Sequence, residues 1–276
     1  MYGLEMVEPE YFFTQRSWDE HVRGLERERQ GKGVGSWSAD EYLPQGTVGA
    51  IALDEDGVVC CATSTGGMTN KLTGRIGDTP VVGAGFWAEE WDEDGDPTGT
   101  SRRGCGAGST AWDRIEQVAR RAGPVVALSE SLKGLMTDCW PTPFAYAPML
   151  EQPRPDLVAT RSLAVSGTGN GDSFLRIAAA RTVGSIARFA TVPSGVALSR
   201  VAGPSGDLQK SAGDRWGRTG EGEGGMIGIE CAVVRDGNGH WVETRSEILQ
   251  DFNCGGMFRA WIDDEGEPHV RIWREE

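Results

Sequence analysis

The sequence is short of basic residues and of long apolar runs. Its 276 residues include 27 Lys and Arg against 41 Asp and Glu, so the formal charge at neutral pH is −14. This balance argues against nucleic acid or an anionic membrane surface as a partner, because both need clustered Lys and Arg. No apolar run approaches the roughly 18 residues of a membrane-spanning helix.

Cysteine motifs are also lacking, because the six cysteines form no Cys-x-x-Cys pattern and Cys60 and Cys61 are adjacent in an expected strand. We predict reduced, packed thiols in a cytoplasmic protein, rather than a disulfide framework or a metal site. The first residues carry no charged-then-apolar leader, which agrees with this location. We expect no cofactor and no catalytic metal.

Glycine, in contrast, is abundant at 40 residues, and the apolar runs are short. This favours many tight turns between strands over a helical bundle. The apolar runs at 48–53 and 58–62 flank the turn residues 54–57, and they predict a hairpin buried on both faces. Further strands are expected at 81–85, 162–166, 226–234, 240–244, 257–262 and 270–273.

Apolar residues at helical spacing predict three helices. They cover residues 17–29, with Ser17 as N-cap, residues 111–122, and a stretch that starts at 172 and carries apolar residues as far as Ala187. Residues 31–45 have no apolar period and predict a linker. Residues 86–160 are irregular, and we expect an insertion that lies over the domain.

Thr47 follows Gly46 and stands at the mouth of an apolar run. A threonine hydroxyl is a poor nucleophile without a base, but an N-terminal threonine can use its own α-amine. That solution suits a chain with only three histidines. Thr65 stands at the far end of the expected hairpin, and antiparallel pairing can return it to Thr47. The alternative is an ordinary strand-start residue with a cross-strand neighbour.

Two other pairs of residues suit substrate binding. Arg75 and Asp78 lie three residues apart in a glycine-bounded turn. Arg75 can bind the carboxylate of a free amino acid, and Asp78 can accept from its ammonium group. An ordinary surface ion pair is the alternative. Thr168 and Gly169 precede the long helix, where backbone N–H groups can hold a developing oxyanion. A plain glycine-rich turn is the alternative there, and the dinucleotide-binding fingerprint is not met.

Four segments together resemble one family. They are residues 46–49, 63–71, 74–80 and 83–85. In order and spacing they are similar to the core of the plant-type L-asparaginase/isoaspartyl peptidase family, whose members are N-terminal nucleophile hydrolases. The strong similarity covers residues 46–85 and 164–190, and a looser one covers 224–273.

The resemblance implies an α+β fold: a four-layer αββα sandwich of two antiparallel sheets flanked by helices. Nothing comparable to the family's upstream His-Gly-Gly-Ala-Gly stretch is present, so we expect the first elements of that fold to be missing. The resemblance also implies autocleavage between Gly46 and Thr47. Residues 1–46 would be the C-terminal part of an α-subunit, and residues 47–276 a catalytic β-subunit with an insertion at about 86–160. The two would form an αβ heterodimer that can pair into (αβ)₂.

The resemblance implies a role for each residue of the site. Thr47 would be the nucleophile and, through its freed amine, the base, while Thr65 would hydrogen-bond to it and tune it. Substrate would be bound by Arg75 at its α-carboxylate, by Asp78 at its α-amine, by Thr168, and by Gly169 near the oxyanion hole.

The implied reaction is hydrolysis of the side-chain amide of asparagine, or of a β-aspartyl peptide bond, through a β-aspartyl-threonine ester. Two alternatives stay open. Residues 168–172 resemble the N4-glycosylasparaginase branch, whereas Gly66-Gly67 points to the asparaginases. A catalytically inactive, unprocessed fragment is the second alternative.

Overall fold

The structure is a computed structural model that describes residues 6–31, 46–93, 149–150, 156–190 and 192–273. Its helices are the 3-10 helix η1 (Pro9–Phe12), α1 (Gln15–Arg29), α4 (Gly171–Ile177), α5 (Ala179–Phe189), α6 (Ser194–Ala202), α7 (Asp207–Ala212) and the 3-10 helix η2 (Gly213–Arg215). Its strands are β1 (Val48–Leu53), β2 (Val59–Ser64), β3 (Phe86–Asp92), β4 (Leu157–Gly169), β5 (Gly224–Asp236), β6 (Trp241–Phe252), β7 (Arg259–Ile262) and β8 (Pro268–Arg271).

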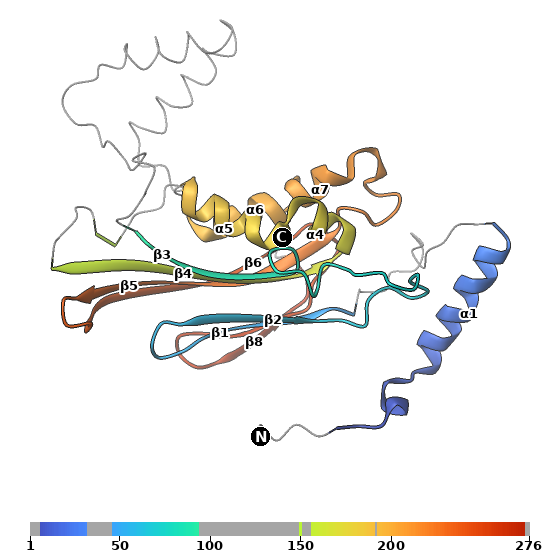
Figure 1. Cartoon of the computed structure of the whole chain (residues 1–276), viewed down its shortest axis with the longest axis horizontal. Helices are drawn as coiled ribbons and strands as arrows, with labels where there is room; N and C mark the ends of the chain where they lie inside the picture. The colour runs from blue at the N-terminus through green and yellow to red at the C-terminus, as the bar shows by residue number, and fades with distance from the viewer. Residues whose placement is uncertain (1–5, 32–45, 94–148, 151–155, 191, 274–276) are drawn as a thin grey trace, which may run out of the picture.

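The centre of the molecule is an antiparallel sheet in the order β3-β4-β5-β6. The long strands β4 and β5 pair without interruption from Leu157↔Asp236 to Gly169↔Gly224. Both are buried along most of their length, because helices α4–α7 cover one face of the sheet and the β1–β2 hairpin lies against the other (Figure 1). The apolar core lies between this sheet and the helices and includes Leu163, Val165, Phe174, Val183, Leu198, Val201, Leu208, Met226 and Leu249.

The predicted long helix after residue 171 is two helices, α4 and α5, with a break at Ala178. Ala178 adopts a left-handed backbone conformation (φ 46°), which turns the chain between the two. The turn lets the first N–H groups of α5 donate outside the helix: Ala180 N to the carbonyl of Ala84 (3.2 Å) and Arg181 N to that of Gly83 (2.8 Å). These N–H groups have no partner inside a helix, so the contact stabilises the start of α5.

The hairpin predicted at 48–62 is confirmed, with β1 bounds identical to the expected ones. Asp54 closes the turn, since its carboxylate accepts from the N–H groups of Asp56 (3.0 Å) and Val58 (2.8 Å). Burial on both faces was the wrong expectation: exposure alternates along β2, and Val48 and Val58 are 67% and 58% exposed. Among the described elements, only one face of the hairpin packs on another sheet.

Helices α4–α7, the four-stranded sheet and the β1–β2 hairpin therefore form three layers (Figure 1). The α+β class with antiparallel sheets is confirmed. The fourth layer of an αββα sandwich stays a prediction. Among the described helices, none is both long and apolar enough to cross a bilayer.

Two contacts align the hairpin with the central sheet. At its open end, Thr63 Oγ1 lies 2.8 Å from Ser166 Oγ of β4. At its turn, the carbonyl of Asp56 accepts from Arg235 Nη2 of β5 (3.1 Å). Since β4 ends where β5 begins, the start of β1, the end of β2 and the end of β4 all lie at the same end of the molecule.

Two expectations for the middle of the chain need correction. Residues 81–85 are a turn rather than a strand, with Ala84 N donating to the carbonyl of Val81 (3.0 Å). Residues 86–92 form β3, paired with β4 from Phe86↔Ser166 to Asp92↔Thr160, so this part of the expected insertion belongs to the central sheet. The helix expected at 111–122 and nearly all of the linker at 31–45 lie outside the described residues.

Helix α1 is confirmed, but its N-cap is Thr14, whose hydroxyl accepts from Ser17 N (3.2 Å), rather than Ser17. The helix lies beside the sheets (Figure 1). His21 contacts the loop that follows β2: its ring Nδ1 bonds to Asn70 Oδ1, and Asn70 Nδ2 donates to the carbonyl of His21 (3.1 Å). A part of the chain before residue 46 is thereby held against a part after it.

Candidate active site

The two predicted catalytic threonines flank the last pair of the β1–β2 ladder. The register ends at Val48↔Ser64, so Thr47 precedes this pair and Thr65 follows it on the opposite strand. Thr47 is partly buried, and Thr65 Oγ1 accepts from the N–H of Gly67 (3.0 Å). The register therefore leaves Thr47 and Thr65 next to the last pair at the open end of the hairpin, one on each side of the ladder.

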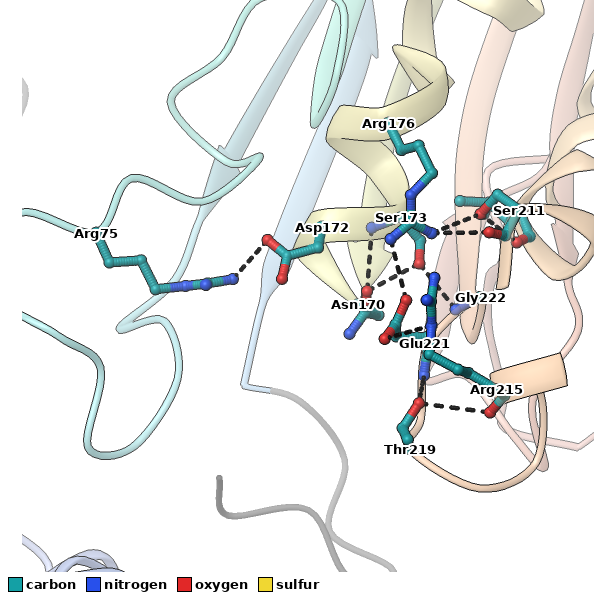
Figure 2. Close-up of polar contacts among 11 residues, drawn as sticks. Arg75, Asn170, Asp172, Ser173, Arg176, Ser211, Arg215, Thr219, Glu221 and Gly222 are labelled. Carbon is teal, nitrogen blue, oxygen red and sulfur yellow. Dashed lines mark hydrogen bonds and ion pairs between the residues drawn. The ribbon is translucent and has the colours of Figure 1, made fainter. Parts of the chain in front are cut away.

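Thr168 and Gly169 end β4 at this same end of the molecule. Gly169 has φ 148°, and a Cβ there would lie 2.4 Å from the carbonyl oxygen of Glu223, so the position requires glycine. Asn170 then caps α4, since its Oδ1 accepts from Ser173 N (3.0 Å) and Ser173 Oγ (2.8 Å) (Figure 2). Thr168 and Gly169 are held between a paired strand and a capped helix.

Arg75 reaches from the 74–80 loop to the start of α4, where its Nη2 lies 2.8 Å from Asp172 Oδ1 (Figure 2). The two side chains are 29% and 51% exposed. Sequence reasoning had matched Arg75 with a substrate carboxylate and gave Asp172 no role. An exposed pair of this kind is worth about 1 kcal/mol or less, so a ligand carboxylate can displace Asp172 from Arg75 at low cost.

Asp78 lies against the same helix start but is buried, with 8% of its surface exposed. Its Oδ1 occupies the space beside Gly171, where a Cβ would lie 2.6 Å from it. Burial raises the pKa of Asp78; backbone N–H groups oppose this rise, Asp172 adds to it, and Arg75 lowers it. A carboxylate with this desolvation and a cation nearby is suited to hold an ammonium group.

A set of contacts ties the start of α4 to the loop before β5 (Figure 2). Ser173 Oγ accepts from Gly222 N (2.8 Å), and Glu221 forms ion pairs with Arg176 (3.0 Å) and Arg215 (2.9 Å). These residues hold α4 in place from the side opposite to Arg75. Sequence reasoning did not identify them, because each bond joins residues more than 30 positions apart or lies in a loop without a motif.

The structure thus brings Arg75 and Asp78 to the start of α4, and Thr47 and Thr65 to the open end of the hairpin. Between described residues, no hydrogen bond joins Arg75 or Asp78 directly to Thr47 or Thr65. The first pair is connected to β4 through α4, and the second through the hairpin. Within the described ranges, no group of three or more His, Cys, Asp and Glu side chains is arranged to hold a metal ion. The functional groups of the candidate site are therefore threonine hydroxyls, the guanidinium of Arg75, and the carboxylates of Asp78 and Asp172.

These features define a class: an α+β protein with two threonines at the open end of a hairpin and a cation–carboxylate pair at the start of a helix. Residues 1–93 match the Asparaginase family. Over 89 residues the chain is 49% identical to the isoaspartyl peptidase of Escherichia coli (strain K12), covering 31% of this chain and 27% of that protein. Over 88 residues it is 47% identical to the plant-type L-asparaginase of Pyrobaculum calidifontis, covering 31% and 28%.

The isoaspartyl peptidase/L-asparaginase of Macaca fascicularis is 49% identical over 87 residues, which cover 32% of this chain and 26% of that protein. The predicted resemblance is confirmed over residues 1–93, which are similar to isoaspartyl peptidases and plant-type L-asparaginases. The matches span only about a quarter of the length of these relatives. The family match ends before Thr168, so the similarity proposed for residues 164–190 and 224–273 stays a prediction.

Proposed function

We propose that this chain is a threonine-dependent amidohydrolase. In this proposal it cleaves itself between Gly46 and Thr47 and then hydrolyses the side-chain amide of asparagine or a β-aspartyl peptide bond. The observation that supports the proposal is the hairpin register, which ends at Val48↔Ser64 next to Thr47 and Thr65, at the end of the molecule where β4 ends with Thr168 and Gly169. The names of the matched relatives support the substrate class.

The reaction begins once Thr47 has a free amine. The Thr47 hydroxyl attacks the side-chain carbonyl carbon of the substrate, and the amine of the same residue accepts the hydroxyl proton. The proton passes to the leaving nitrogen, which departs as ammonia or as the amine of the next residue. A β-aspartyl-threonine ester remains, and water hydrolyses it to aspartate with the amine again acting as base. Thr65 hydrogen-bonds to the nucleophile, and backbone groups near Thr168 and Gly169 stabilise the oxyanion.

Substrate orientation comes from the groups at the start of α4. Arg75 binds the α-carboxylate after this group displaces Asp172, and Asp78 accepts from the α-ammonium group. Because only one end of the substrate carries both groups, this clamp fixes which carbonyl faces Thr47. We further propose a four-layer sandwich, a cytoplasmic αβ heterodimer that can pair into (αβ)₂, and no cofactor.

The raised pKa of Asp78 predicts an unusual acid limit for activity. Asp78 must be ionised to bind an ammonium group, so kcat/KM falls as the pH drops through its pKa, and this fall begins above the ordinary aspartate value of about 3.9. The free energy of unfolding changes in the opposite direction to kcat/KM. A carboxyl group with a raised pKa in the folded state favours folding as the pH falls. A pH profile of kcat/KM measures the limit.

Two variants check this assignment. Asp78→Asn lowers kcat/KM and removes the acid limb. Asp172→Asn is the matched control: it removes the like charge that raises the pKa of Asp78, so the limb moves to lower pH while activity persists. A wild-type limb at or below the ordinary aspartate value contradicts the role of Asp78.

The proposal as a whole is tested on the purified chain by denaturing electrophoresis and N-terminal sequencing. Cleavage gives fragments of 46 and 230 residues (276 − 46), the larger one beginning with Thr47. An active preparation that stays intact overturns the mechanism, and an intact, inactive one identifies an unprocessed fragment. Asparagine, a β-aspartyl dipeptide and a glycosylated asparagine are then compared as substrates. Dominant turnover of the glycosylated asparagine assigns the chain to the N4-glycosylasparaginase type instead.

A further inference from the structure

A pair of hydroxyl groups joins the hairpin to β4 just behind the candidate site. Thr63 Oγ1 and Ser166 Oγ are 2.8 Å apart. Ser166, which is 2% exposed, also donates to the carbonyl of Ala62 (3.2 Å). Each hydroxyl has one proton and a carbonyl within reach, Ala62 for Ser166 and Gly85 for Thr63, so either hydroxyl can be the donor between the two.

The backbone on both sides of this hydroxyl pair approaches closely. Gly49 lies opposite Thr63 in the hairpin, and a Cβ at Gly49 would lie 2.2 Å from Ser166 Oγ. The carbonyl of Gly85 accepts from Gly167 N (2.8 Å) and lies 3.4 Å from Thr63 Oγ1. Gly49 and the hydroxyl of Ser166 therefore pack tightly together. A larger side chain at either position would move the hairpin away from the central sheet.

The hydroxyl pair is also linked to the loop that carries Asp78. A Cβ at Gly85 would lie 2.7 Å from the carbonyl oxygen of Asp78, so residues 78 and 85 are packed backbone to backbone. The Gly85 carbonyl contacts both partners of the interface: Thr63 of the hairpin and Gly167 of β4. One small region thus contacts the hairpin, β4 and the 78–85 loop.

Three proposed site residues, one at the end of β4 and two directly beside β1 and β2, lie two positions from this region. Thr47 is two before Gly49, Thr65 is two after Thr63, and Thr168 is two after Ser166. Residues two apart on a strand point to the same face and are about 7 Å apart. The distance between the hairpin and β4 at the hydroxyl pair therefore sets the distance of Thr47 and Thr65 from Thr168, two residues further along.

We propose that the Thr63–Ser166 hydroxyl pair is a positioning element that sets the distance of Thr47 and Thr65 from Thr168. The inference rests on the proposed function for its catalytic consequence. Neither hydroxyl touches the substrate. The pair holds the hairpin at hydrogen-bond distance from β4, about 0.5–1 Å closer than a methyl group in van der Waals contact would allow.

Thr63→Val tests this with little change in shape, because a methyl group replaces the hydroxyl. The hairpin should move away from β4, and a displacement approaching 1 Å lowers kcat by about 10²-fold. KM should change less than kcat, because the bond from Gly167 N to the Gly85 carbonyl still holds the loop that carries Asp78 on β4. Self-cleavage at Gly46–Thr47 should slow as well. Thr63→Ser keeps the hydroxyl and should restore both rates.

Ser162→Ala is the matched control. Ser162 lies on β4 four positions before Ser166 and is also buried, but its hydroxyl donates to Glu90 of the neighbouring strand β3 (3.0 Å). Its loss should lower the thermal midpoint about as much as Thr63→Val does, with kcat close to that of the wild type. If Ser162→Ala and Thr63→Val lower kcat equally, or if Thr63→Val lowers neither rate, the positioning role is wrong.

Hydrogen exchange of the full chain separates this inference from the proposed function. Amides at 46–50 and 166–170 should exchange faster in Thr63→Val than in Thr63→Ser or Ser162→Ala, whether or not the chain hydrolyses anything. A wild-type chain without cleavage or activity, but with this exchange pattern, refutes the function and retains the positioning element. Equal exchange in all three variants refutes the positioning element.

Discussion

Thr47→Ala leaves the chain uncut and abolishes amide hydrolysis. In the proposed mechanism the Thr47 hydroxyl attacks the Gly46 carbonyl during self-cleavage and the substrate carbonyl during turnover. Alanine lacks this hydroxyl, so one substitution should remove both reactions. The loss of kcat should be on the order of 10⁶-fold, as when another hydrolase loses its nucleophile. Denaturing electrophoresis over several days and an ammonia-release assay with asparagine measure the two effects on one preparation.

Two variants at the open end of the hairpin make the Thr47 experiment specific. Thr47→Ser keeps both the hydroxyl and, after cleavage, the amine, so it should still process and turn over substrate at a reduced rate. Ser64→Ala removes an exposed hydroxyl from the residue paired with Val48 and should leave both reactions intact. Cleavage of the Thr47→Ala chain at the same peptide bond would show that the threonine hydroxyl is not the attacking group.

Local signals were sufficient for the hairpin and for the approach of Thr47 to Thr65. The turn residues from Asp54 to Gly57 specify where the chain reverses, and the strands on either side follow from it. Once the turn is known, the register is determined, and position 65 must return to position 47. This part of the site depends on contacts between residues at most 18 positions apart, which is why the pattern revealed it.

Strand β3 was not predicted, because the partners of its Glu89 carboxylate are far away in the sequence. Its sequence contains Glu89, the first of several acidic residues between positions 89 and 96, which are typical of a loop. In the structure Glu89 forms ion pairs with Arg181 (2.8 Å) and Arg188 (3.5 Å) of α5, more than 90 positions away. A buried carboxylate needs such partners, and no local pattern indicates that they will arrive.

The Arg75–Asp172 pair was missed for the same reason. Both residues stood in segments that had been singled out, but they are 97 positions apart, and only the packing of the 74–80 loop on α4 brings them together. Residue type indicated that Arg75 can bind a carboxylate. It could not indicate that a carboxylate of the protein already lies beside it.

The buried pair of Arg161 and Glu230 gives the largest expected effect on stability. The two side chains are 2% and 6% exposed and 2.7 Å apart, Arg161 Nη2 to Glu230 Oε2. The guanidinium also donates to Ser194 Oγ (2.8 Å) and to the carbonyl of Ala187 (3.3 Å), and it lies over the ring of Trp91. One side chain of β4 thus binds β5 and helices α5 and α6.

Arg161→Ala should lower the free energy of unfolding by about 3–5 kcal/mol, because it leaves the Glu230 carboxylate buried with only the more distant cation of Arg245 (4.0 Å). Urea denaturation measures the loss. Arg176→Ala is the matched control, since its pair with Glu221 is more exposed, and it should cost about 1 kcal/mol or less. Equal losses in the two variants would contradict the assignment of a buried, strongly coupled pair.

The double variant Arg161→Met with Glu230→Leu separates charge from packing. If the loss in Arg161→Ala comes from an uncompensated carboxylate, removing both charges while keeping apolar volume should recover most of it. If it comes instead from the bonds to Ser194 and Ala187 that hold α5 and α6 on the sheet, the double variant should remain destabilised. In that case Arg161→Lys, which keeps the charge but lacks the planar fork, should also be destabilised, because an ammonium group cannot reach β5 and both helices at once.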